Sequence, residues 1–149
     1  MSSLINQGWK LTKTVLPQHT DHASVMWHGS YLNFLEEGRI DALNKVGMSY
    51  SELSKKGFEI PVISANIMYK KSFIHGETVL LISQFKLLKK IRLNCKTYFL
   101  KLNGDIAAES LLELVVVKKK NDSLKLLREL PLEVKNILLL LEEGPKING

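Results

Sequence analysis

The sequence has a single cysteine and no apolar run of membrane length. One thiol cannot form an intrachain disulfide, and a zinc site built on cysteines is excluded. We expect Cys95 to pack as a small hydrophobic side chain within a strand. The longest apolar run, Ile137 to Leu141, is far shorter than the roughly 20 residues of a membrane span. Residues 1–10 lack the basic start and apolar stretch of a signal peptide, so a cytoplasmic protein is predicted.

The chain has an excess of positive charge. Its 149 residues are 45% hydrophobic, which predicts one globular domain over residues 1–149. Lys and Arg exceed Asp and Glu to give a net charge of +6, which favours an anionic partner. No zinc-finger spacing, RNP-like aromatic run or Gly-x-x-Gly clamp occurs, and the lysines are scattered, so nucleic acid is not the expected partner.

Two helices are predicted in the first half of the chain. A wide apolar stripe over residues 31–46 predicts a long helix, with Ser30 as its N-cap and Gly47 as its end. Gly38 costs this helix about 1 kcal/mol relative to alanine. We therefore expect another backbone to come close to Gly38. A short second helix is predicted over residues 50–56.

Strands precede and follow these helices. Alternation of apolar and polar residues predicts a strand over residues 9–16. Further strands are expected over residues 58–69, 78–88, 93–102 and 106–117. A polar break at 118–122, a linker at 122–130 and a C-terminal helix at 131–143 complete the chain. This order predicts an α+β fold with an antiparallel sheet packed on the long helix. The apolar C-terminal helix either packs back on the domain or covers a neighbouring subunit.

The loop over residues 18–29 is the strongest candidate for a functional site. It holds three histidines and Asp21, and it leads directly into the long helix. The first turn of a helix has N–H groups without acceptors and a positive potential, so it can stabilise an oxyanion. A nearby carboxylate could attack a carbonyl or activate a water. Asp21 could instead be a turn former or a cap.

A spaced pattern runs through this loop and the helix. His28 follows Asp21 by seven residues, Tyr31 opens the helix, and FLEEGR begins at Phe34. The segment IPVISANIMYKKSF, residues 60–73, comes next. The pattern resembles the signature of the 4-hydroxybenzoyl-CoA thioesterase family, in which the helix reads Phe-x-Glu-x-Ala-Arg.

The resemblance implies a hotdog fold, in which an antiparallel sheet wraps around a long central helix, over about residues 9–118. It implies hydrolysis of an acyl-CoA, with Asp21 as the nucleophile or the base. The backbone N–H at or near His28 would polarise the carbonyl, and Trp27 and Tyr31 would contact the substrate. No metal or cofactor is implied. The family works as homodimers or homotetramers with sites at subunit boundaries.

The resemblance also bears on the acyl group. Relatives with this loop in photosynthetic bacteria hydrolyse 1,4-dihydroxy-2-naphthoyl-CoA, an intermediate of phylloquinone biosynthesis. Val25, Met26 and Trp27 suit a flat ring and equally a fatty chain. Many family members have glycine where Ser24 stands, which leaves the acyl group open.

Basic residues are candidates for the phosphates of CoA. Lys89, Lys90 and Arg92 lie at an expected strand turn, where the resembling family contacts the nucleotide. Lys70 and Lys71 are second candidates. Either cluster could instead be a solvated turn.

Other functions use the same residues. The loop histidines and Asp21 could bind zinc, although their spacing matches no standard metal motif. Related hotdog enzymes use a helix carboxylate, for which Glu36 and Glu37 are candidates, and His28 with either glutamate could serve a dehydratase. A protein that only binds acyl-CoA gains nothing from the carboxylate of Asp21 beside an anionic ligand.

Overall fold

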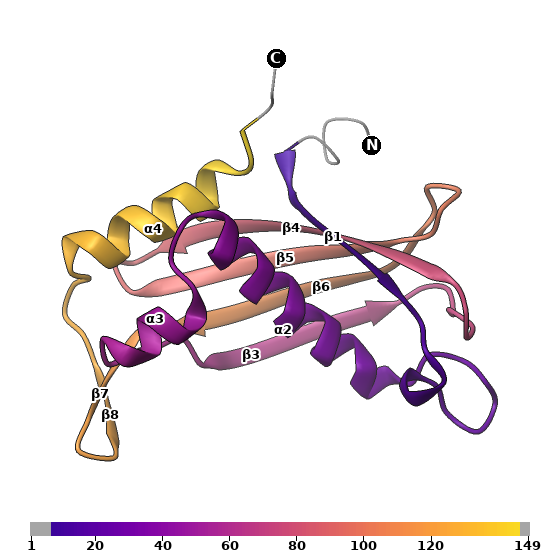
Figure 1. Ribbon diagram of the computed structural model, residues 1–149, viewed down its shortest axis with the longest axis horizontal. Coiled ribbons are helices and arrows are strands. Elements are labelled where there is room, and N and C mark those ends of the chain that lie inside the picture. Colours follow the sequence, from indigo (N-terminus) through magenta and orange to yellow (C-terminus); the bar gives the residue numbers. More distant parts are fainter. Residues whose placement is uncertain (1–6, 147–149) are drawn as a thin grey trace.

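A computed structural model describes residues 7–146 and shows one sheet packed against one long helix (Figure 1). The main sheet is antiparallel, and its strands lie in the order β1 (Trp9–Thr14), β4 (Thr78–Leu88), β5 (Arg92–Leu100), β6 (Ile106–Val115) and β3 (Val62–Tyr69). The helix α2 (His28–Lys45) crosses one face of this sheet. The predicted α+β fold is confirmed.

The core lies between α2 and the sheet because alternate strand residues point toward the helix. Val79, Leu81 and Phe85 of β4 are buried in this layer. Phe34 of α2 and Phe99 of β5 are fully buried in the same core. Burying each such ring contributes roughly 1.5–3 kcal/mol.

The long helix begins earlier than predicted. It starts at His28, and its N-cap is Trp27, which makes no side-chain cap. Ser30 is therefore not the N-cap, and that prediction is wrong. The hydroxyl of Ser30 instead donates to the carbonyl oxygen of His19 at 3.0 Å. This bond ties the first turn of the helix to the preceding loop.

Gly38 lies midway along α2 over β4. A Cβ built on Gly38 would meet the hydroxyl oxygen of Ser83 at 3.7 Å, an ordinary contact. Beyond the helix itself, no backbone atom of residues 7–146 lies within 4 Å of that Cβ. The prediction of a close backbone approach is therefore wrong, and an alanine has room here.

A hairpin occupies the region predicted as a polar break and a linker. It consists of β7 (Val117–Lys120) and β8 (Ser123–Leu126), and β7 also pairs with β2 (Phe58–Glu59). The turn residues Asn121 and Asp122 have positive φ, 49° and 63°, as a two-residue hairpin turn requires. Three of the four residues of β7 are exposed lysines, so no apolar pattern marked the strand. The hairpin projects from the body at the lower left of Figure 1.

The C-terminal helix α4 (Leu132–Glu143) packs back on its own domain, which is the first of the two arrangements expected for it. Its buried residues Val134, Leu138 and Leu141 belong to the core formed by α2 and the main sheet. The indole Nε1 of Trp9 donates to the carbonyl oxygen of Leu141 at 2.8 Å. We infer from this shared core that the described residues form one domain.

The short helix α3 (Tyr50–Lys55) and the 3-10 turn η1 (Pro17–His19) complete the described elements. Cys95 is buried in β5, as predicted. None of the helices within residues 7–146 is long and apolar enough to cross a membrane. The signal-peptide prediction concerned residues 1–10, of which residues 1–6 lie outside the described residues.

Candidate active site

Asp21 lies in a tight turn between β1 and α2. The Ser24 N–H donates to the Asp21 carbonyl at 3.0 Å, and the Asp21 N–H donates to the Val25 carbonyl at 2.9 Å. The carboxylate oxygen Oδ1 accepts the N–H groups of Ala23 at 2.8 Å and Val25 at 3.4 Å. No residue between 7 and 146 donates to Oδ2, so Asp21 can shape the turn and still serve a substrate. Ser24 has φ 64°, which explains why the resembling family often has glycine there.

Two neighbouring segments hold this loop against the helix. The Met26 N–H donates to the Phe73 carbonyl at 2.7 Å, and the Trp27 N–H donates to the His19 carbonyl at 2.8 Å. The ring nitrogen Nδ1 of His19 accepts the N–H of Leu16 at 3.0 Å. His19 therefore organises the backbone of the loop. Across the described part of the chain, no three or more His, Cys, Asp or Glu side chains gather as metal ligands would.

The first turn of α2 carries free hydrogen-bond donors. The first N–H groups of a helix lack intrahelical acceptors. Those of His28 and Gly29 have no acceptor anywhere in residues 7–146. The indole of Trp27 lies across Gly29, because a Cβ built on Gly29 would be 2.1 Å from that ring. Only glycine at this position leaves the indole where it is.

A pocket of about 290 Å³ opens between the loop, the start of α2 and the end of β3. It is lined by Asp21, Met26, His28, Tyr31, Tyr69, Lys70, Lys71 and Ser72. The rings of Tyr31 and Tyr69 meet edge to face with centroids 4.9 Å apart, and the Tyr69 hydroxyl donates to the His28 carbonyl at 3.4 Å. Burial, with smaller effects of Tyr69 and Glu77, raises the pKa of Tyr31 to about 12. The Tyr31 hydroxyl therefore stays neutral and can donate a hydrogen bond.

The structure gathers some predicted site residues and separates others. Asp21, His28 and Tyr31 line one pocket, and Trp27 lies beside it over Gly29. Lys70 and Lys71, the second choice for phosphate contacts, also line this pocket. They pair with Glu109 at 3.3 Å and Asp105 at 2.7 Å, respectively, on the exposed surface.

Lys89, Lys90 and Arg92 lie at the opposite end of the sheet. Thr78 begins β4 beside the end of β1, and the turn with Lys89 and Lys90 follows the last residue of β4. At about 3.3 Å per residue, the eleven residues of β4 span roughly 33 Å. Within one protomer these three residues therefore do not reach the pocket that Asp21 lines.

The helix carboxylates lie away from this pocket as well. Glu37 pairs with Lys13 at 3.0 Å. Glu36 borders a separate cavity of about 50 Å³, with Arg39 and Tyr50 among its other lining residues. The glutamates required for the dehydratase alternative do not meet His28 in one protomer.

Sequence reasoning missed Tyr69, Glu77 and Lys101. Tyr69 ends an exposed strand, where an aromatic residue carries no periodic signal. Lys101 donates to Glu77 at 2.8 Å, and these two residues lie 24 positions apart in the chain. The adjacent pair of Tyr69 and Lys70 at the end of β3 was the available signal for this side of the pocket.

The antiparallel sheet packed on one long helix defines a class of protein, the hotdog fold. Its pocket has Asp21 on one side and the start of α2 on the other, and such groups can act on a carbonyl. The model of the Thioesterase-like superfamily matches residues 15–138, so the chain belongs to this superfamily. The predicted hotdog fold and the predicted enzyme class, a thioesterase, are confirmed. The finer resemblance to the 4-hydroxybenzoyl-CoA thioesterase family stays a prediction.

Similar proteins agree with this membership. A Synechocystis protein named as an esterase, sll0410, is 28% identical over 144 residues, which are 96% of this chain and 86% of that protein. YneP of Bacillus subtilis, named as an acyl-CoA thioesterase, is 41% identical over 59 residues, 40% of this chain and 43% of YneP. The crystal structure of Slr0204, a 1,4-dihydroxy-2-naphthoyl-CoA thioesterase from Synechocystis, superposes with a TM-score of 0.80 at 18% identity, covering 90% of this chain and 97% of Slr0204. At this low identity, the likeness to Slr0204 shows a shared fold only.

Proposed function

We propose that the chain hydrolyses an acyl-CoA thioester to a free acid and CoA in the pocket that Asp21 lines. The observation that supports this most is the shared border of that pocket: Asp21 on one side and the start of α2 at His28 on the other. A carboxylate can act as a base or a nucleophile, and fixed N–H donors stabilise an oxyanion. Superfamily membership and the activity named for YneP support the same reaction.

The chemistry has two routes that use the same groups. In one, Asp21 takes a proton from a water whose oxygen bonds to the thioester carbon. In the other, the Asp21 oxygen bonds to that carbon, and water later cleaves the mixed anhydride. In both, the N–H groups of His28 and Gly29 donate hydrogen bonds to the carbonyl oxygen and stabilise the negative charge that develops on it. The C–S bond breaks when the tetrahedral intermediate collapses, and CoA leaves as a thiolate that takes up a proton. In the second route this step produces the anhydride, which water then cleaves.

An aromatic acyl group is the proposed substrate, with 1,4-dihydroxy-2-naphthoyl-CoA as the first candidate. Tyr31 and Tyr69 give the pocket two aromatic walls, and the nearly half-exposed Trp27 adds a third flat surface beside it. Aromatic side chains favour stacked and edge-to-face contacts with a planar ring. The activity printed for Slr0204 supports this choice. The cytoplasmic location stays a prediction of the sequence.

We further propose that the protein acts as a homodimer or homotetramer joined through β3. Within residues 7–146, β3 pairs with β6 along one side only, and its other edge is free. Ile63, Met68 and Tyr69 of this strand are 48%, 58% and 50% exposed. An exposed, apolar edge strand is a template for pairing with another copy. Antiparallel pairing of two copies puts the pocket at the subunit boundary and turns the Lys89 end of one sheet toward the partner's Asp21 loop.

The test is a panel of acyl-CoA substrates assayed by thiol release. It includes 1,4-dihydroxy-2-naphthoyl-CoA, 4-hydroxybenzoyl-CoA and short and long fatty acyl-CoAs. For the preferred substrate, Asp21→Asn is expected to lower kcat by at least about 100-fold with little change in KM, because a transition-state role is removed. Asp122→Asn, an exposed turn aspartate with the same charge change, is the control and keeps the wild-type kcat. Equal rates for wild type and Asp21→Asn refute the assignment.

A further inference from the structure

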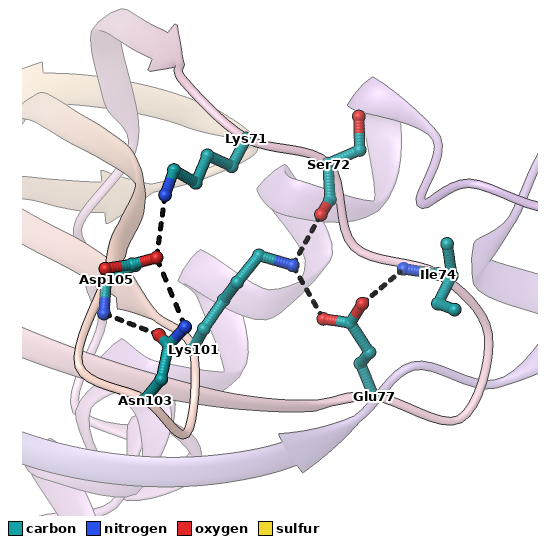
Figure 2. A network of polar contacts seen from close by, with 7 residues as sticks. All are labelled: Lys71, Ser72, Ile74, Glu77, Lys101, Asn103 and Asp105. Carbon is teal, nitrogen blue, oxygen red and sulfur yellow. Dashed lines mark hydrogen bonds and ion pairs between the residues drawn. The ribbon is translucent and has the colours of Figure 1, made fainter.

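Lys101 follows β5 and reaches back to the segment that joins β3 and β4 (Figure 2). Its ammonium donates to the Ser72 carbonyl at 2.6 Å and to a carboxylate oxygen of Glu77 at 2.8 Å. The same ammonium lies 4.6 Å from the centre of the Phe73 ring. The Lys101 side chain is only 19% exposed. One cation therefore holds residues 72–77 at three points.

The clamped segment is irregular backbone that is also held by backbone bonds. The Gly76 N–H donates to the Val15 carbonyl at 2.8 Å, and the Val15 N–H donates to the Glu77 carbonyl at 2.9 Å. Those bonds hold the end of the segment near β4, whereas Ile74 is joined to the Asp21 loop by an isolated bridge to Val25. The second carboxylate oxygen of Glu77 accepts the Ile74 N–H at 3.4 Å (Figure 2). Charge-assisted bonds shielded from water are stronger than those on the surface. Removing the ammonium leaves a half-buried carboxylate without its counter-charge.

The neighbouring ion pair in Figure 2 is a weaker restraint. Lys71 pairs with Asp105 at 2.7 Å, and both side chains are about half exposed. Exposed pairs of this kind contribute little because solvent and salt screen them. Lys101, rather than Lys71, is therefore the cation that fixes this segment.

The other side of the clamped segment holds the loop of Asp21. The Met26 N–H donates to the Phe73 carbonyl at 2.7 Å, and Val25 forms its bridge with Ile74. Val25 in turn bonds Asp21 twice, through its carbonyl at 2.9 Å and through its N–H at 3.4 Å to Oδ1. A short series of backbone bonds thus connects the Lys101 clamp with the carboxylate.

We propose that Lys101 is a positioning residue for thioester hydrolysis. By holding residues 72–77, it fixes the Asp21 loop against the start of α2. This inference rests on the proposed function. Catalytic groups must be held closely, since a displacement of about 1 Å can cost about 100-fold in rate. Lys101 itself lines no part of the pocket, so it acts on the reaction through the loop alone.

The experiment compares Lys101→Met, Lys101→Arg and a control, Lys56→Met. The control breaks the ion pair between Lys56 and Glu133, which involves neither the loop nor the pocket. With the preferred acyl-CoA, Lys101→Met is expected to lower kcat by about 10- to 100-fold and to change KM by less than about threefold. Lys101→Arg keeps the charge and restores most of kcat, and Lys56→Met keeps all of it.

Hydrogen exchange supplies a readout besides activity. Lys101→Met is expected to speed amide exchange in peptides covering residues 20–30, while peptides from β4 and β5 exchange at the wild-type rate. Wild-type kcat in Lys101→Met, or faster exchange spread evenly over the chain, overturns the proposal. If Lys101→Met does not fold, Glu77→Gln, which keeps the side-chain shape, carries the same two measurements. A fully active Asp21→Asn overturns the proposed function, whereas an inactive Asp21→Asn with a fully active Lys101→Met overturns the clamp alone.

Discussion

Replacing Gly38 by alanine tests how α2 packs on the sheet. A glycine within a helix lowers the stability of the folded protein by about 0.5–1 kcal/mol relative to alanine. The new methyl group lies in ordinary contact with Ser83, 3.7 Å away, in a buried position. Burying one methyl group adds about 0.8 kcal/mol. Gly38→Ala is therefore expected to raise the free energy of unfolding by about 1–2 kcal/mol, with kcat unchanged.

Urea unfolding measures this difference, with Gly47→Ala as the matched control from the end of the same helix. Gly47 has φ 92°, a left-handed conformation that costs alanine about 1–2 kcal/mol. The two substitutions make the same chemical change, and we expect opposite signs. For a chain of this length, the Gly38→Ala gain corresponds to a rise in Tm of about 2–8 °C. A loss of stability in Gly38→Ala would show that α2 lies closer to a neighbour than described here.

Two further predictions concern reactivity and substrate affinity. Burial raises the pKa of Cys95 to about 11. At pH 8 the folded protein is therefore expected to react with a thiol reagent only as fast as it unfolds. Rapid labelling without denaturant would contradict this prediction. Lys70→Ala with Lys71→Ala is expected to raise KM for acyl-CoA, more strongly at low salt, while kcat stays within about threefold. Lys89→Ala with Lys90→Ala is expected to raise KM only if the partner's sheet completes the site, and an unchanged KM in an oligomer excludes that contact.

The regular elements of the core were largely predictable because burial leaves a period in the sequence. β4 has the predicted bounds, Thr78 to Leu88, since every second residue faces α2 and polar turns flank it. The hairpin of β7 and β8 was missed because it lacks this burial. Its residues are almost all exposed, so a real strand produced no apolar alternation. The start of helix α2 was predicted too late in the sequence. Its N-cap, Trp27, makes no side-chain hydrogen bond, so no capping pattern marks the position.

The candidate site was predictable where it is local in sequence. The step from Asp21 to His28 runs from the loop to the first residue of α2, and both residues line the pocket. Tyr69 ends β3 and Lys101 follows β5, and no spacing rule connects either residue to Asp21. The turn that holds Lys89 was a wrong choice within one protomer. Its basic side chains suit phosphates, but the sequence does not reveal that the turn lies at the far end of the sheet.

A crystal structure with a non-hydrolysable acyl-CoA analogue tests the central claim most directly. We expect the carbonyl oxygen to lie about 3 Å from the N–H of His28 or Gly29, and the carbonyl carbon about 3–3.5 Å from Oδ2 of Asp21 or from a water that Asp21 holds. An analogue whose carbonyl lies away from the first turn of α2, with Asp21 turned to bulk solvent, would contradict it.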